Sequence, residues 1–204
     1  EYAYFEWKRK VKEALRKKNI SLAQELLQKK EALDGAVNAA LQEQFYRYIQ
    51  GILKGTYADI SDLEEAIRLT HPEFSGKIEE EDLFSIQELN LLLFYAKCKM
   101  QRDTEQGREL LEALLLYIQE HITDIQAKNQ IFPRAVSIYC QEVKEKQFSE
   151  KRYFLCKEAL ENSVQNQSFE YAVSILEDLE KDSRYFGKNA DCYQVWKNAL
   201  KEIY

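Results

Sequence analysis

Two stretches, Asn19–Leu27 (NISLAQELL) and Ser168–Leu176 (SFEYAVSIL), decide how this chain is expected to fold. In both, a polar and an apolar residue are followed by two spacers, an alanine, two more spacers and two aliphatic residues. The apolar positions recur at the spacing of one helix face. The alanines, Ala23 and Ala172, stand where two helices can approach closely. The shared pattern predicts a chain built from repeated, packed helices.

The composition favours helices in the rest of the chain as well. Gly and Pro together supply 8 of the 204 residues, about a third of their usual share of roughly 12%. A β-rich or α/β chain of this size needs more turn residues and phosphate-loop glycines. The longest apolar runs, residues 91–96 and 113–118, fall far short of the ~18 residues that span a bilayer, so no transmembrane helix is predicted.

Hydrophobic periodicity predicts ten helices joined by short loops. Their expected ranges are about 3–18, 20–33, 36–53, 61–69, 83–101, 104–121, 125–146, 148–166, 169–181 and 190–204. Gly55 stands where a left-handed residue often ends a helix. Pro133 lies inside the seventh range, so it either kinks that helix or occupies its first turn. Residues 70–82 (THPEFSGKIEEED) form the clearest break and divide the chain into 1–69 and 83–204.

Consecutive helices of this kind resemble tetratricopeptide (TPR) repeats, whose second helices begin with the pattern quoted above. We therefore expect an all-α fold: a TPR-like right-handed superhelix of about five helix pairs, forming a single domain over residues 1–204. The pairs would start near residues 3, 36, 86, 131 and 168, which is an uneven spacing. An irregular helical bundle remains the alternative.

The sequence contains few of the residues that catalytic and metal sites commonly use. There are two histidines, His71 and His121, and the four cysteines, Cys98, Cys140, Cys156 and Cys192, have no C-x-x-C spacing. Each cysteine lies among apolar neighbours, which is typical of buried, reduced thiols. No phosphate-loop, serine-hydrolase or zinc-protease motif occurs. We expect no enzyme, no cofactor and no metal.

Charge is distributed unevenly along the chain. Residues 1–54 hold 11 Lys and Arg against 7 Asp and Glu, whereas residues 55–204 hold 18 against 28. The acidic part is not typical of an independent nucleic-acid binder. The basic beginning, from Lys8 to Lys18, is interpreted as a solvated helix face, with a nearby polyanion as the alternative.

Five further stretches carry a resemblance to a known family: residues 85–93 (SIQELNLLL), 107–118 (GRELLEALLLYI), 127–135 (AKNQIFPRA), 154–160 (FLCKEAL) and 196–204 (WKNALKEIY). Together they resemble the sensor domain of RRNPP-type transcriptional regulators (Rgg-like and PlcR-like) of Firmicutes. In that family an N-terminal helix-turn-helix precedes a TPR-type domain that senses short signalling peptides in the cytoplasm, as in quorum sensing.

No helix-turn-helix segment is found in this chain, which begins at Glu1 and whose only methionine is Met100. We therefore expect it to be part of a longer protein. The resemblance implies that DNA would be bound only through the missing domain, and that the chain forms a homodimer. A constitutive TPR-like scaffold for protein–protein interaction, without a peptide signal, remains the alternative function.

Helix geometry indicates candidate residues for peptide binding and for dimerisation. Amide and cationic side chains beside the apolar helix faces could bind the backbone groups and charges of an extended peptide. The candidates are Gln44, Arg47, Asn90, Phe94, Lys97 and Arg134. An apolar stripe on the last helix predicts a dimer interface of Tyr193, Trp196, Leu200 and Ile203, with packing onto the preceding helix as the alternative.

Overall fold

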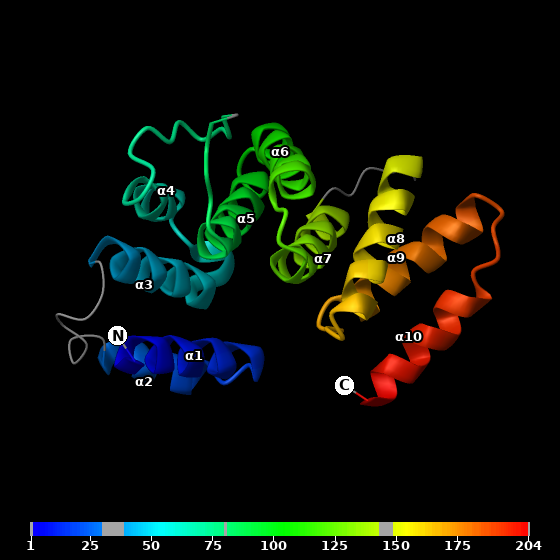
Figure 1. Cartoon of the computed structure of the whole chain (residues 1–204), viewed down its shortest axis with the longest axis horizontal. Coiled ribbons are helices and arrows are strands. Elements are labelled where there is room, and N and C mark those ends of the chain that lie inside the picture. The colour runs from blue at the N-terminus through cyan, green and yellow to red at the C-terminus, as the bar shows by residue number, and fades with distance from the viewer. Residues whose placement is uncertain (1, 30–38, 80, 143–148, 204) are drawn as a thin grey trace. The chain divides into compact units, whose positions relative to one another are not determined.

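The computed structural model describes residues 2–29, 39–79, 81–142 and 149–203 (Figure 1). All regular structure in these ranges is helical, so the expectation of an all-α chain is confirmed. The elements are α1 (Tyr2–Arg16), α2 (Ile20–Gln28), α3 (Ala39–Lys54), the 3-10 helix η2 (Gly55–Tyr57), α4 (Ile60–Arg68), α5 (Ile86–Met100), α6 (Thr104–His121), α7 (Ile125–Glu142), α8 (Glu150–Gln165), α9 (Ala172–Tyr185) and α10 (Asp191–Ile203). None of the described helices combines the length and apolarity that a membrane crossing requires.

Side-chain caps determine where several helices begin. Asn19 precedes α2, and its side-chain oxygen accepts a hydrogen bond from the Leu22 N–H at 3.1 Å. Ser85 and Glu88 form a reciprocal capping box, which starts α5 at Ile86 rather than at the expected Leu83. Leu83 precedes that box and is exposed. The helix begins at the capping box because the box provides hydrogen-bond partners for the otherwise unpaired N–H groups of the first turn.

The structure confirms the conformation expected at Gly55 and decides between the two placements expected for Pro133. Gly55 has a φ of +58°, the left-handed conformation expected directly after α3. Pro133 lies well inside α7 and is buried, so it does not occupy the first turn. The expected end of the second helix and start of the third lie in residues 30–38, outside the described residues. The expected end of the seventh helix and start of the eighth likewise fall in 143–148.

The chain forms two compact units, residues 1–76 and 77–204, whose boundary falls inside the 70–82 break. In the first unit, Trp7 of α1 donates its indole N–H to the Leu26 carbonyl of α2 at 2.7 Å. The Trp7 ring also meets Phe45 of α3 edge to face, with centroids 5.5 Å apart. These contacts join α1, α2 and α3, and the buried residues Leu63, Ala66 and Ile67 of α4 add to the core of the unit.

The second unit contains α5 to α10, and each helix packs against the next one along the chain. In addition, α5 packs against α7, and α7 packs against α9. Gly107 of α6 allows a close approach to α5, because a Cβ at that position would lie 2.4 Å from the Met100 backbone nitrogen. The core is formed by fully buried aliphatic and aromatic side chains, among them Leu92, Leu111 and Phe132.

Candidate functional site

Three of the predicted peptide-binding residues form a stripe along α5. Asn90, Phe94 and Lys97 are all partly exposed, and their spacing places them on one helix face. The Asn90 amide nitrogen donates to the Ile86 carbonyl of its own helix at 2.7 Å. The Asn90 side-chain oxygen accepts a hydrogen bond from the guanidinium of Arg134 on α7. The structure therefore brings Asn90 and Arg134 together from positions 44 residues apart.

Further polar contacts continue this stripe across α7 to α9. The ammonium of Lys97 lies 3.5 Å from a carboxylate oxygen of Glu142 on α7. One turn after Arg134, the hydroxyl of Ser137 lies 2.9 Å from the hydroxyl of Ser174 on α9. We call the group Asn90, Phe94, Lys97, Arg134, Ser137 and Ser174 the polar stripe. Sequence reasoning missed the two serines, although Ser137 follows Arg134 at the i+3 spacing of one helix face.

Gln44 and Arg47, the other two predicted residues, lie on α3 in the first unit. Gln44 is fully buried, and its amide nitrogen donates to the Ala66 carbonyl at 3.2 Å and to the Thr70 hydroxyl at 2.8 Å. Arg47 pairs with Glu43 at 2.9 Å and with Glu65 of α4 at 2.7 Å. Those carboxylates raise the pKa of Arg47. Both side chains thus hold α3 to α4.

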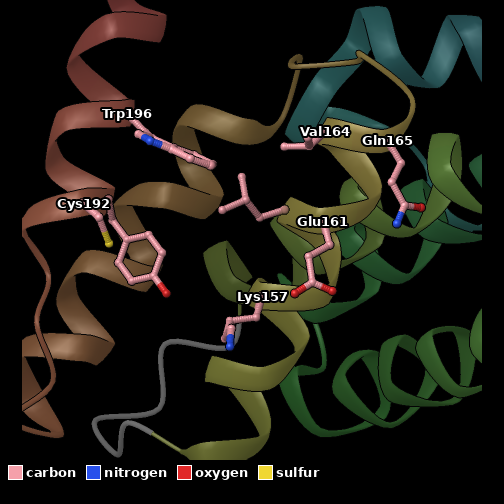
Figure 2. Close-up of a pocket in the computed structure, with 8 residues that line it drawn as sticks. Lys157, Glu161, Val164, Gln165, Cys192 and Trp196 are labelled. Carbon is pink, nitrogen blue, oxygen red and sulfur yellow. The ribbon is translucent and has the colours of Figure 1, made fainter.

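A second candidate site is the groove between α8 and α10, with a volume of about 370 Å³. We call it the α8/α10 groove; its lining residues are Lys157, Leu160, Glu161, Val164, Gln165, Cys192, Tyr193 and Trp196. Trp196 points from α10 toward α8, where it faces the side of Val164 and Glu161 (Figure 2). Trp196 is 52% exposed and Val164 is 45% exposed, so the apolar wall of the groove is open.

Two ion pairs attach α10 to α9. Lys197 donates to Glu180, and Lys201 lies 2.6 Å from Glu177. Hydrogen bonding to the two lysines lowers the pKa of Glu177 and of Glu180. Of the predicted dimer residues, Tyr193 and Leu200 are partly exposed, and the side chain of Ile203 lies outside the described residues. Burial and a hydrogen bond with Tyr153 raise the pKa of Tyr193.

A buried polar cluster joins α7, α8 and α9. Arg152 lies 2.8 Å from a carboxylate oxygen of Asp182, which is fully buried, and 3.3 Å from one of Asp178. Burial raises the pKa of both carboxyl groups, and Arg152 opposes that increase. The Sγ atoms of Cys140 and Cys156 lie 3.4 Å apart beside this cluster. Cys98, Cys140 and Cys156 are buried as expected.

The prediction of a buried thiol was wrong for Cys192, which is exposed. Its apolar neighbours Val195 and Trp196 share the uncovered side of α10, so a hydrophobic surrounding in sequence did not imply burial. Of the two histidines, His121 stacks on Tyr117 with ring centroids 4.6 Å apart. Over the described ranges, no group of three or more His, Cys, Asp or Glu side chains is arranged to hold a metal ion.

Comparisons with known proteins assign this chain to no family. No protein-family model matches the sequence, and neither the curated proteins nor the solved structures contain a match. The polar stripe and the α8/α10 groove are the features of the chain that bear on its function.

Proposed function

We propose that this chain is the peptide-sensing and dimerising part of a cytoplasmic bacterial transcriptional regulator of the RRNPP type, with a TPR-like right-handed superhelix. The helix order of residues 77–204 supports the proposal. Each helix packs on the next, and the alternate helices α5, α7 and α9 also pack on one another. Stacked helix pairs have this arrangement, in which the first helix of every pair lines one common surface.

The observation that carries the peptide proposal is the contact between Asn90 of α5 and Arg134 of α7. An extended peptide presents unpaired N–H and C=O groups, and an asparagine amide can both donate to and accept from them. Arg134 and Lys97 supply positive charge for a terminal carboxylate or an acidic side chain, in a chain with a net charge of −6. Phe94 adds an apolar contact. The polar stripe thus offers the chemistry that a short peptide needs.

Gln44 and Arg47 contribute less to this proposal. A peptide bound to Gln44 would have to displace its contacts with Ala66 and Thr70 inside a buried interface. Replacing satisfied, buried hydrogen bonds yields little net free energy. The proposed peptide surface therefore consists of the partly exposed members of the polar stripe, which are Asn90, Phe94, Lys97, Arg134 and Ser174. Ser137 is buried and supports this surface from below.

The test is calorimetric titration of a library of short synthetic peptides against the wild type and Asn90→Ala. Losing one partly buried amide contact should weaken binding by about 1–3 kcal/mol, or roughly ten- to hundred-fold in affinity. Gln106→Ala, which removes an exposed amide from α6, is the matched control and should leave affinity unchanged. Equal affinity of Asn90→Ala and wild type would remove the polar stripe from the site.

The homodimer is proposed to form through α10. Trp196 and Val195 are more than half exposed there, and Trp196 lines the apolar α8/α10 groove. A large aromatic side chain that lines an apolar groove is typical of residues that dominate association energies. Tyr193 and Leu200, which are partly exposed on the same helix, would extend the interface.

The scaffold function is the second candidate, and one observation favours it. Asn90, Lys97 and Arg134 already have partners within the chain, so a peptide would exchange contacts rather than fill vacant ones. A scaffold would bind a folded partner and no short peptide. The peptide titration separates the two functions, because a scaffold would give no binding heat with any peptide in the library.

A further inference from the structure

The two thiols of Cys140 and Cys156 are brought together by the packing of α7 against α8. Their Sγ atoms are 3.4 Å apart, although the residues are 16 positions apart in the sequence. A disulfide bond requires about 2.05 Å, so the sulfur atoms have to approach by a further ~1.4 Å. Both thiols are free in this structure, and their sulfur atoms are in direct contact. The pair is thus placed for a cross-link between two helices.

The surroundings make the two thiols unequal. Cys140 retains 7% of its surface, whereas Cys156 has none, so an oxidant meets Cys140 first. Arg152 and its partners Asp178 and Asp182 lie beside the pair, and Arg152 is one turn before Cys156 on α8. Because Cys140 is the more accessible of the two thiols, it is assigned the role of the attacking thiol.

Cys156 has the surroundings of a thiol that stays protonated. Its hydrogen bond to Cys140, its burial and the charges of Asp178 and Asp182 all raise its pKa. Those carboxylates come from α9 and are paired with Arg152. This division of roles is found in pairs where one cysteine reacts and a neighbour resolves.

We propose that Cys140 and Cys156 are a redox-active dithiol, which a hydroperoxide converts to a disulfide joining α7 to α8. The Cys140 sulfur attacks the terminal oxygen of the hydroperoxide, the O–O bond breaks, and the released alkoxide takes the Cys140 proton and leaves as an alcohol. Cys140 is then a sulfenic acid. The Cys156 sulfur attacks the Cys140 sulfur, the S–O bond breaks, and hydroxide leaves as water with the Cys156 proton. The two thiols lose two electrons in total, which reduce the hydroperoxide.

The experiment uses the full chain with Cys98→Ser and Cys192→Ser, so that only this pair can react. After treatment with hydrogen peroxide, mass spectrometry should find the loss of two hydrogen atoms and one cross-linked peptide containing Cys140 and Cys156. Dithiothreitol should reverse both changes. The oxidised chain should melt at a higher temperature, because the cross-link restricts the unfolded state.

Two single variants test whether Cys140 attacks and Cys156 resolves. The unmodified chain is measured as well, so that the proposal can be tested even if a variant fails to fold. Cys156→Ala should stop at a Cys140 sulfenic acid that dimedone traps, whereas Cys140→Ala should resist oxidation at Cys156. In the unmodified chain, peptide mapping should find the same Cys140–Cys156 cross-link. Two free thiols after peroxide treatment, or a disulfide formed only between chains through Cys192, would overturn the proposal. Peptide binding is not involved in this measurement, so its outcome is independent of the proposed function.

Discussion

Helices α7, α8 and α9 are joined through their interiors, whereas α10 is attached to α9 at its surface. The first three helices contribute fully buried residues such as Phe132, Cys156 and Leu179. In addition, the buried ion pairs of Arg152 join α8 to α9. None of the described side chains of α10 is buried. Removal of an interior group leaves a cavity or an unpaired charge, so sequence changes should be tolerated far better in α10.

The largest effect is expected from Arg152→Ala in the interior. This substitution leaves the fully buried carboxylate of Asp182 without its cation, which should lower the free energy of unfolding by about 3–5 kcal/mol. Urea denaturation followed by circular dichroism measures the change. Lys201→Ala, which breaks an exposed pair on α10, is the control and should cost about 0–1 kcal/mol. Equal losses of unfolding free energy in the two variants would contradict the distinction between the interior of α7 to α9 and the surface contacts of α10.

Gly107→Ala tests how tightly α5 and α6 approach each other. The added Cβ would meet the Met100 backbone at 2.4 Å, so one of the helices has to shift. Overpacking of this kind should cost about 1–3 kcal/mol, measured by the same denaturation. Gln106→Ala, one residue earlier and exposed, should change stability by no more than about 0.5 kcal/mol. A stable Gly107→Ala variant would mean that the α5–α6 interface is adaptable.

Trp196→Ala tests whether the exposed side of α10 forms the homodimer interface. We expect a loss of stability of about 1 kcal/mol or less, since the side chain is half exposed. If the dimer forms as proposed, light scattering should find that the mass falls from dimer to monomer, because the large aromatic side chain of the interface is gone. Tyr185→Ala, another exposed aromatic in the same unit, should leave the mass unchanged. A wild-type monomer at high concentration would contradict the proposed dimer.

The smallest effect is expected from acidification of the α9–α10 ion pairs. The lysines lower the pKa of Glu177 and of Glu180 in the folded state. Their stabilising contribution is therefore complete above the ordinary value of 4.5 and is lost as the pH falls through the lowered folded values. Fluorescence of Trp196 in a Trp7→Phe background should report loosening of α10 below that pH. A signal that stays constant down to global unfolding would mean that apolar contacts alone hold α10.

Local signals in the sequence predicted the helices and several of their ends. Asn19 caps the start of α2 and Gly55 follows the end of α3. Both effects are independent of tertiary packing, because capping and positive φ involve only neighbouring backbone groups. The start of α5 was placed too early, although Ser85 and Glu88 carry the spacing of a capping box. That signal lies in the sequence itself, two residues after the Leu83 at which the helix was expected to begin.

The candidate site could be predicted only in part. Helical spacing placed Asn90, Phe94 and Lys97 on one stripe, since that spacing depends on one helix alone. It could not indicate that Gln44 turns inward to Ala66, because a buried and an exposed glutamine have the same local pattern. Nor could it reveal that Cys192 stays exposed while Cys156 is fully buried.

The amino-acid sequence alone specifies an all-helical chain and the faces of its helices, because helix formation depends on hydrogen bonds and propensities within a few residues. Tertiary packing decides which of those faces meet. It brings Arg134 to Asn90 across 44 positions, Arg152 to Asp182 across 30, and Cys140 to Cys156 across 16. Such pairs depend on how whole helices are oriented, and side-chain burial over the entire unit determines that orientation.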